Sequence, residues 1–443
     1  MTFRDKFASL AALRPVKQSC AGTGGQPQVS KAAPRGYRAA LPDGAERLAE
    51  MLGASESTNG FGEHLTVRKW FSQAIGGNPP DGMLSSSALR LLAPISCDEV
   101  NDPCRWLFLD TETTGLMGGT GTYPFLVGIA WWYAGGLEVE QFFMRELSEE
   151  HALLVTLAER MAERPILITF NGKSFDWPLL ETRYRMTRAL PAAQPRAHLD
   201  FLHPARNLWR IRLGSVRLAE LEKQVLGFHR GADLVSEMIP QFYFDYLRGG
   251  SPEPLLQVFL HNQMDLRGLA GLASRILAIL SEPEAHGADA LELFGISRIC
   301  ERRGETARAR KHYAQSLSAD LPLEAGRSAR GSLARLAKRD GDLPVACELW
   351  ERNLGSTRDG LEAYEQLAIY YEHQAADPHR AAELVHEALA DLGQARREGR
   401  LSAAVNRQYR QRFEHRAKRL ERLKRKAAQS LLNSVEAESS AHN

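Results

Sequence analysis

The sequence predicts a mixed α/β domain followed by an all-α region of helical repeats. Short apolar runs typical of buried strands, such as WLFLD and PILITF, alternate with amphipathic helical segments in the first part of the chain. After Pro283 the pattern indicates helices only. A chain of 443 residues also exceeds the size that one hydrophobic core usually supports, so more than one domain is expected.

Four segments are predicted along the chain. Residues 1–60 are rich in Gly, Ser, Pro and Ala, and we expect a flexible N-terminal region with a short helix over Ala45–Leu52. The α/β domain is expected over residues 61–282 and the helical repeats over 283–395. Residues 396–443 are expected to form a basic C-terminal helix and tail.

Each element of the α/β domain follows from its local pattern. His64–Phe71 indicates a strand, and Phe125–Met144 indicates two strands joined by a Gly-Gly turn. Ser148–Glu163 indicates a helix with Ser148 as its N-cap. The remaining elements are a buried strand at Pro165–Phe170 and helices at Phe175–Arg188 and Leu255–Leu280.

A repeated pattern of small and aromatic residues marks the helical region. Gly304, Ala309 and Tyr313 recur 37 residues later as glycine, alanine and tryptophan, and a looser third copy contains Ala381 and Val385. The pattern resembles the tetratricopeptide repeat, which has a period of about 34 residues. Stacked helix pairs of this kind, or of an unrelated helical array, predict a scaffold that binds a protein partner.

Composition and charge restrict the class of protein. The formal charge is only +2, but residues 396–426 contain 13 Lys and Arg against three Glu. Such a block is either a solvated helix face or a nucleic-acid contact. The five cysteines are too scattered for a disulfide framework or a zinc site. Because no run of about 18 apolar residues is found, we expect a soluble, cytoplasmic protein without a membrane contact.

The strongest chemical signal is the segment DTETTG, which ends a buried apolar strand. Alternation along a strand places Asp110 and Glu112 on the same side. Two neighbouring carboxylates in apolar surroundings repel each other and lack solvent, and a divalent cation relieves both costs. The segment therefore predicts a metal site, with Gly115 allowing a close approach of a ligand.

Two further segments carry polar residues in a similar context. Asp176 follows the apolar strand at Pro165–Phe170, where it either joins the metal site or simply favours a helix N-terminus. His261 and Asp265 are four residues apart and lie on one face of a predicted apolar helix. Taken alone, each pair has an ordinary structural interpretation, but their order along the chain favours a shared site.

These three segments together resemble a known family. Asp110 and Glu112, then Asn171 to Asp176, then His261 and Asp265 are similar to the three exonuclease motifs of the ribonuclease H-like DEDD superfamily, over residues 103–281. The segments TTGLMGGTGTYPFLVG, HLDFLHPARNLW and IPQFYFDYL resemble those of its YprB-like branch. The resemblance implies a ribonuclease H-like mixed sheet flanked by helices, with tetratricopeptide-like repeats after it.

The resemblance also implies a two-metal nuclease. Asp110, Glu112, Asp176 and Asp265 would hold two Mg²⁺ or Mn²⁺ ions, for which carboxylate oxygens are suitable ligands. His261 would act as the general base, although it precedes Asp265 by four positions, as the tyrosine does in tyrosine-type members. Substrate contacts are expected from two further residues, Thr113 and Asn171. Asp200, Asp245 and Lys173 are expected to be structural.

The resemblance favours a 3′→5′ exonuclease on single-stranded DNA or RNA, and an endonuclease of the same fold would differ only in product length. An alternative is a non-catalytic scaffold with a vestigial nuclease fold, whose helical repeats bind a protein. No acidic position is missing, which favours the enzyme. The basic C-terminal stretch is predicted either to bind a phosphate backbone or to cap the helical array.

Overall fold

The protein was analysed as a computed structural model. It describes residues 41–42, 44–77, 86–92, 98–115, 120–187, 194–231 and 234–440. Two predicted parts of the chain lie outside the described residues. They are the N-terminal region before residue 41 that is predicted to be flexible, and residues 116–119 after Gly115.

Within the described residues, seven strands form one mixed sheet in the order β1-β2-β5-β4-β3-β6-β7. The strands are β1 (Ser55–Asn59), β2 (Gly62–Phe71), β3 (Trp106–Thr113), β4 (Pro124–Tyr133), β5 (Gly136–Phe143), β6 (Ile166–Thr169) and β7 (Ala197–Asp200). Neighbours from β1 to β3 pair antiparallel, whereas β3, β6 and β7 run parallel. The predicted mixed α/β sheet is confirmed.

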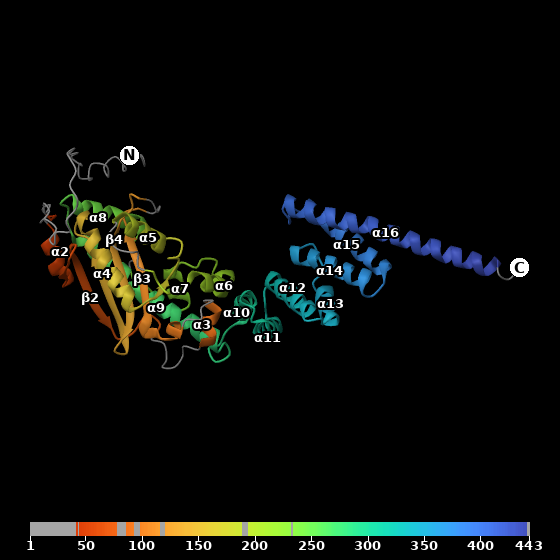
Figure 1. Cartoon of the computed structure of the whole chain (residues 1–443), viewed down its shortest axis with the longest axis horizontal. Helices are drawn as coiled ribbons and strands as arrows, with labels where there is room; N and C mark the ends of the chain where they lie inside the picture. Colours follow the sequence, from red (N-terminus) through yellow and green to blue (C-terminus); the bar gives the residue numbers. More distant parts are fainter. Residues whose placement is uncertain are drawn as a thin grey trace, which may run out of the picture. The chain divides into compact units, whose positions relative to one another are not determined.

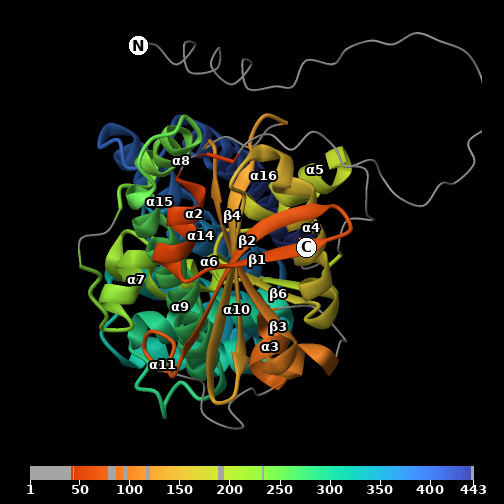
Figure 2. The same cartoon turned by 90° about the vertical axis from the view of Figure 1, so that its left-hand side faces the viewer.

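Helices cover both faces of this sheet. They are α2 (Ala45–Leu52), α3 (Ser86–Leu92), α4 (Glu150–Glu163), α5 (Asp176–Thr187), α6 (Leu202–Leu213), α7 (Leu218–Gln224), α8 (Ile239–Leu247) and α9 (Glu253–Ser281). Short 3-10 turns occur at Asp98–Asn101, Pro103–Arg105, Leu147–Glu149 and Ser236–Met238. Figure 1 shows the order of the elements, and Figure 2 shows α4 and α5 on one face and α9, α2 and α7 on the other.

The predicted elements need local corrections. The helix over Ala45–Leu52 is confirmed, but the sheet already begins with β1, which lies within the segment predicted to be flexible. Ser148 is not an N-cap, because it lies in a 3-10 turn and its hydroxyl donates to Glu146. The turn between β4 and β5 is formed by Ala134 and Gly135, both at positive φ, rather than by two glycines.

The chain continues as a helical region. Its helices are α10 (Ala290–Arg303), α11 (Thr306–Ser318), α12 (Leu323–Arg339), α13 (Leu343–Glu351), α14 (Arg358–His373), α15 (Pro378–Arg397) and α16 (Ala403–Ser440). The repeated small and aromatic side chains, such as Ala309 with Tyr313 and Ala346 with Trp350, are buried between paired helices. The predicted all-α region is therefore present.

The turns inside the helix pairs repeat as well. Gly304, Gly341 and Ala376 each have a positive φ, of 80°, 85° and 52°. Each is followed by an acidic residue that immediately precedes the next helix, and the buried alanine comes five positions after the turn residue in all three pairs. The repeat is thus visible in the backbone, while its assignment to the tetratricopeptide family stays a prediction.

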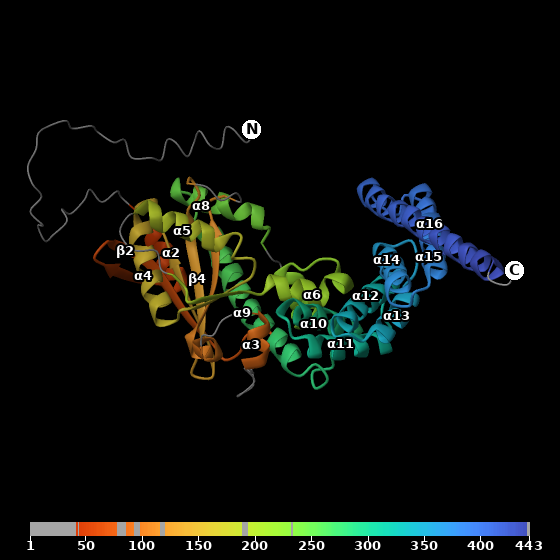
Figure 3. The same ribbon diagram turned by 45° about the vertical axis from the view of Figure 1, so that its right-hand side comes forward.

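The helical region and the α/β domain share a core. One cluster of buried residues includes Phe108 of β3, Leu269 of α9, Phe294 of α10 and Tyr313 of α11. Helix α10 packs directly against α6 (Figure 3). A Cβ on Gly295 would lie 2.4 Å from the carbonyl oxygen of Asn207, which shows how closely the two backbones approach.

Candidate active site

The site is built on three neighbouring strands. Asp110 of β3 lies opposite Gly128 of β4, which in turn lies opposite Gln141 of β5. Asn262 of α9 fills the space above the glycine, because a Cβ on Gly128 would lie only 2.0 Å from its Oδ1 atom. Gly128 is therefore required for α9 to reach the carboxylate. Because side chains alternate along β3, Glu112 lies on the same face as Asp110.

A chain of three buried amides ends on Asp110. Gln263 donates to Gln141 at 2.7 Å, and Gln141 donates to Asn262 Oδ1 at 2.7 Å. Asn262 then donates to Asp110 Oδ2 at 2.8 Å. Because each amide accepts at oxygen and donates at nitrogen, this direction fixes the N–H of Asn262 toward the carboxylate. One oxygen of Asp110 is thus oriented by the protein itself.

The acids near Asp110 repel one another. Burial, and then the negative charges of Asp265 and Asp176, raise the pKa of Asp110 well above its ordinary value. The hydrogen bond from Asn262 acts in the opposite direction and favours the ionised form. Three of the four predicted acids are therefore close enough to influence one another electrostatically.

Asp176 approaches the site from the other layer of helices. It is the first residue of α5, and Thr111 of β3 donates its hydroxyl hydrogen to Asp176 Oδ1 at 2.6 Å. Burial nevertheless raises the pKa of Asp176 to about 6. Because β3 and β6 are parallel, the loop that leads from β6 to Asp176 emerges at the edge of the sheet where β3 ends.

The loop between β6 and α5 is held in a specific shape. Asp200, at the end of β7, accepts the backbone N–H groups of Asn171 at 2.8 Å and Lys173 at 3.0 Å. Asn171 adopts a φ of 68°, and a Cβ on Gly172 would lie 2.5 Å from Thr169 Cβ. Asp200 therefore acts on the site through this loop, consistent with the structural role expected from the sequence.

His261 connects the remaining two acids. Its Nε2 atom lies 3.5 Å from Asp265 Oδ2 and 4.0 Å from Glu112 Oε1. Asp265 also accepts a hydrogen bond from Arg230, a residue that the sequence did not single out. The same guanidinium pairs with Glu222, which is fully buried, at 2.5 and 2.6 Å. Arg230 is thus a cation anchored at the edge of the acidic cluster.

Other predicted and unpredicted residues lie around this cluster. Thr113 follows Glu112, and its hydroxyl donates to the Gly115 carbonyl at 2.8 Å. Asn171 begins the loop that leads to Asp176. The contact of both residues with substrate stays a prediction. Sequence reasoning missed the residues that orient the acids: Thr111, Gln141, Asn262 and Arg230. The only signal was that polar residues interrupt apolar elements, which does not reveal their partners.

The donor set suits a hard divalent cation in kind. Carboxylate oxygens are preferred by Mg²⁺ and Mn²⁺. Burial is the main cause that raises the pKa values of Asp110 and Asp176, and a bound cation would favour their ionised forms. In the part of the chain that the structure describes, no three His, Cys, Asp or Glu side chains are grouped so as to hold one ion. Arg230 on Asp265 is the contact that a bound ion would share or replace.

Comparison with known proteins defines the family. Residues 107–277 match the ribonuclease H superfamily. The uncharacterized protein YprB of Bacillus subtilis (strain 168) is 32% identical over 291 residues, which cover 64% of this chain and 69% of YprB. The chain belongs to the YprB-like branch of the ribonuclease H superfamily. The match spans β3 to α9, the elements that carry Asp110 and Asp265.

Membership in the ribonuclease H superfamily supports a nuclease-type enzyme that acts on nucleic acid. Nucleases of this superfamily usually use divalent metal ions, which agrees with the acidic cluster. Across the described residues, every helix is too short or too polar to cross a lipid bilayer.

Proposed function

We propose that this YprB-like protein is a metal-dependent nuclease that hydrolyses phosphodiester bonds by a two-metal mechanism, as a 3′→5′ exonuclease on single-stranded DNA or RNA. The observation that carries the proposal is the convergence of acids from three elements: Asn262 orients Asp110, Thr111 holds Asp176, and both Asp176 and Asp265 lie close enough for their charges to act on Asp110. Acids held together in this way need a cation, and β3 is otherwise a buried strand of the core.

The ligands would be Asp110, Glu112, Asp176 and Asp265. When bound, two Mg²⁺ or Mn²⁺ ions supply a nucleophilic water and stabilise the charge on the departing 3′ oxygen. The protein contributes the orientation of the acids. Asn262 directs one oxygen of Asp110, and Thr111 holds one oxygen of Asp176.

His261 is the proposed general base. It lies beside both Glu112 and Asp265, whose negative charges stabilise the imidazolium that forms when the ring accepts a proton from water. Histidine is the side chain that most often serves as a general base near neutral pH. Arg230, fixed by Glu222, supplies a positive charge next to these groups.

The test is hydrolysis of end-labelled single-stranded DNA and RNA oligonucleotides by the full chain, with Mg²⁺ or Mn²⁺. We expect Asp110→Asn to reduce the rate by at least about 100-fold, because the loss of a metal ligand removes several kcal/mol of transition-state stabilisation. Asp245→Asn is the matched control, since Asp245 is exposed on α8 and its carboxylate pairs with the nearby Gln241 and Arg248.

Activity that persists in Asp110→Asn and in excess chelator would come from a contaminant and would contradict the proposal. Product lengths decide the mode of cleavage: mononucleotides released from the 3′ end indicate the exonuclease, and internal fragments indicate an endonuclease. Comparison of the two oligonucleotide types reports the preferred sugar.

A further inference from the structure

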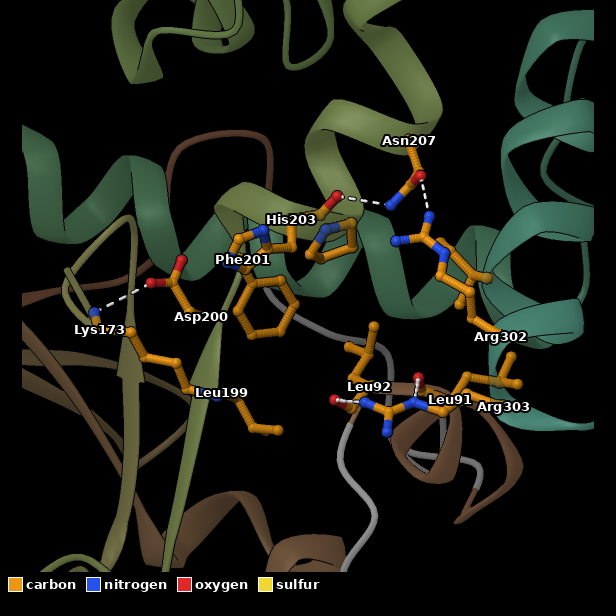
Figure 4. Close-up of a pocket in the computed structure, with 12 residues that line it drawn as sticks. Leu91, Leu92, Lys173, Leu199, Asp200, Phe201, His203, Asn207, Arg302 and Arg303 are labelled. Atoms are coloured by element: carbon orange, nitrogen blue, oxygen red, sulfur yellow. Dashed lines mark hydrogen bonds between the residues drawn. The ribbon is translucent and has the colours of Figure 1, made fainter. Parts of the chain in front are cut away.

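A cavity of about 320 Å³ lies where α6 and α10 meet the loop after β6 (Figure 4). The α/β domain lines it with Lys173 and His203, and the helical region lines it with Arg302 and Arg303. Apolar side chains such as Ile299 complete the wall. The volume is in the range of small-ligand sites, roughly 300–1,000 Å³.

The walls of this cavity are fixed relative to each other. Helix α10 touches the backbone of α6 at Gly295, and Trp209 of α6 donates its indole N–H to Glu292 of α10 at 2.7 Å. Both the tryptophan and the glutamate are buried. The cavity is therefore a preformed feature of the shared core and needs no rearrangement to admit a ligand.

Positive charge dominates the cavity. Three permanent cations, Lys173, Arg302 and Arg303, line it together with a single acid, Asp200. The carboxylate of Asp200 is already engaged by backbone N–H groups of the loop after β6 and of Leu202. An excess of positive charge therefore faces the cavity and favours an anionic ligand.

The two guanidinium groups are oriented but retain donors. Arg303 donates through Nε and one Nη to the carbonyls of Leu91 and Leu92, at 2.7 and 2.6 Å. Arg302 uses Nε and one Nη for the Arg298 carbonyl and the Asn207 side chain. A guanidinium has five N–H donors, so each group can still bind an anion. Burial and then the charge of Arg298 lower the pKa of Arg302.

The cavity adjoins the loop between β6 and α5, which leads to Asp176. Lys173 lies three residues before Asp176 in that loop, and Asp200, which lines the cavity, accepts the backbone N–H groups of Asn171 and Lys173 in the same loop. A single strand of nucleic acid that leaves the acidic cluster along this loop would pass Lys173 and then reach Arg302 and Arg303 of α10. A nucleotide combines a phosphate anion with an aromatic base whose faces pack against apolar or aromatic side chains, which matches the cationic and apolar walls of the cavity.

We propose that this cavity binds one nucleotide of the single strand that is hydrolysed at the acidic cluster, with Arg302 and Lys173 binding its phosphate. The inference rests on the proposed nuclease function and assigns a role to the first helix of the helical region. That helix becomes part of the substrate-binding surface, in addition to any role in protein binding.

The test uses the full chain carrying Asp110→Asn, and measures the binding of a fluorescent single-stranded oligonucleotide by anisotropy at several salt concentrations. We expect Arg302→Gln and Lys173→Gln each to raise Kd about tenfold, because a charge-assisted hydrogen bond is lost. Each should also reduce the slope of log Kd against log salt by about 0.7. Arg352→Gln is the matched control, since it removes the same charge from an exposed position after α13 that does not line the cavity.

The outcomes separate this inference from the nuclease proposal. If the wild-type chain binds and hydrolyses the oligonucleotide but Arg302→Gln and Lys173→Gln bind like Arg352→Gln, the cavity assignment is wrong and the nuclease function stands. If the wild-type chain neither binds nor hydrolyses it, both proposals fail.

A competition experiment identifies the ligand of the cavity. Competition by nucleoside monophosphate well below the concentration at which inorganic phosphate competes supports a nucleotide site. Equal competition by both would reduce it to a plain anion site and overturn the assignment. Lys173 is exposed, so its variant is not expected to affect folding.

Discussion

At the scale of single residues, the orientation of Asp110 depends on atoms that belong to neither the substrate nor a metal ion. The amide of Asn262 directs one carboxylate oxygen, and Gln141 and Gln263 determine which end of that amide faces the acid. Groups that orient metal ligands commonly affect metal affinity almost as strongly as the ligands. Asn262 is therefore expected to be a positioning residue of the site.

We expect Asn262→Leu to weaken Mn²⁺ binding by about 10- to 100-fold, because Asp110 loses the donor that orients it. Isothermal titration calorimetry on the full chain measures this affinity directly and does not depend on substrate. Gln257→Leu, on an exposed position of the same helix, is the control and should bind Mn²⁺ like the wild type. Unchanged affinity in Asn262→Leu would show that the amide chain only packs the core.

Gly128→Ala tests the same arrangement from the strand. Its Cβ would lie 2.0 Å from Asn262 Oδ1, so α9 or the amide has to move. We expect a loss of about 1–3 kcal/mol in the free energy of unfolding, typical of overpacking in a core. Thermal melting followed by circular dichroism compares it with Gly121→Ala, where a Cβ meets open space. Equal melting temperatures would contradict the close approach.

The sequence predicted the acids that we propose as metal ligands, but not the residues that orient them. Asp110 and Glu112 are detectable because they end an apolar strand, and the order of the other acids resembles a family pattern. Asn262 contacts Asp110 across 152 positions of the chain, and no local pattern encodes such a pairing. Arg230 was missed for the same reason, since its partners Glu222 and Asp265 become neighbours only after α7 packs on α9.

At the scale of elements, the turns inside the helix pairs require a left-handed residue. Gly304 and Gly341 supply it without strain, whereas Ala376 has a φ of 52° at the equivalent position. We expect Ala376→Gly to stabilise the protein by about 0.5–1 kcal/mol, and Gly341→Ala to destabilise it by about 1 kcal/mol. Chemical denaturation of the full chain measures both, and the same sign for both changes would refute the equivalence of the turns.

Strand β2 carries a buried histidine, His64, whose lowered pKa makes the stability of the protein depend on pH. Burial lowers the pKa of His64 to about 4, below the value of about 6.5 in an unfolded chain. As the pH falls from 6.5 toward 4, the unfolded chain therefore gains a proton that the folded chain excludes, and stability decreases. We expect a loss of about 2 kcal/mol between pH 7 and pH 5 from this group alone.

Urea denaturation at the two pH values measures this loss. His64→Leu should remove it, since leucine does not titrate, while His415→Leu at an exposed position of α16 should leave the pH dependence unchanged. An identical decrease in the wild type and in His64→Leu would assign the pH dependence to other groups.

Most helices and strands were predictable because their sequence signals are local. The structure differs from the prediction where contacts between distant parts of the chain determine the element. The apolar runs became β3, β4 and β6, and the long amphipathic pattern became α9 within two residues at each end. Strand β1 has little apolar character, with the sequence SESTN, and exists because it pairs with β2. Ser148 has N-cap chemistry, but the chain begins the helix one 3-10 turn later.

At the scale of the whole molecule, the buried core does not follow the predicted boundary at residue 282. One cluster joins the sheet to α10, α11 and part of α12, and a second cluster joins the rest of α12 to α13–α16. Helix α16 closes the second cluster with Phe413 and Leu420, while Arg416 pairs with the buried Glu372 at 2.6 Å. Part of the basic stretch thus caps the helical array, one of the two roles predicted for it.

This division predicts how local unfolding is distributed. Elements that share a core tend to open together. The amide hydrogens of α10 and α11 should therefore exchange with solvent at rates similar to those of the sheet, whereas α13–α16 should form a separate unit. Phe413→Ser removes a large buried side chain from the second cluster only. We expect hydrogen exchange, followed by mass spectrometry on the full chain, to become faster by about 100-fold or more in α13–α16, because such a truncation costs about 3–5 kcal/mol.

The control is Arg425→Gln, an exposed change farther along α16 that should leave exchange unaltered. Protection of β3, β6 and α10 should be the same in both variants and in the wild type, since none of these elements contributes to the second cluster. Faster exchange in the sheet of Phe413→Ser would show that the molecule opens as one unit. In that event the acidic cluster would depend on the distal helices, because their loss would also disturb β3 and the loop between β6 and α5, which position Asp110 and Asp176.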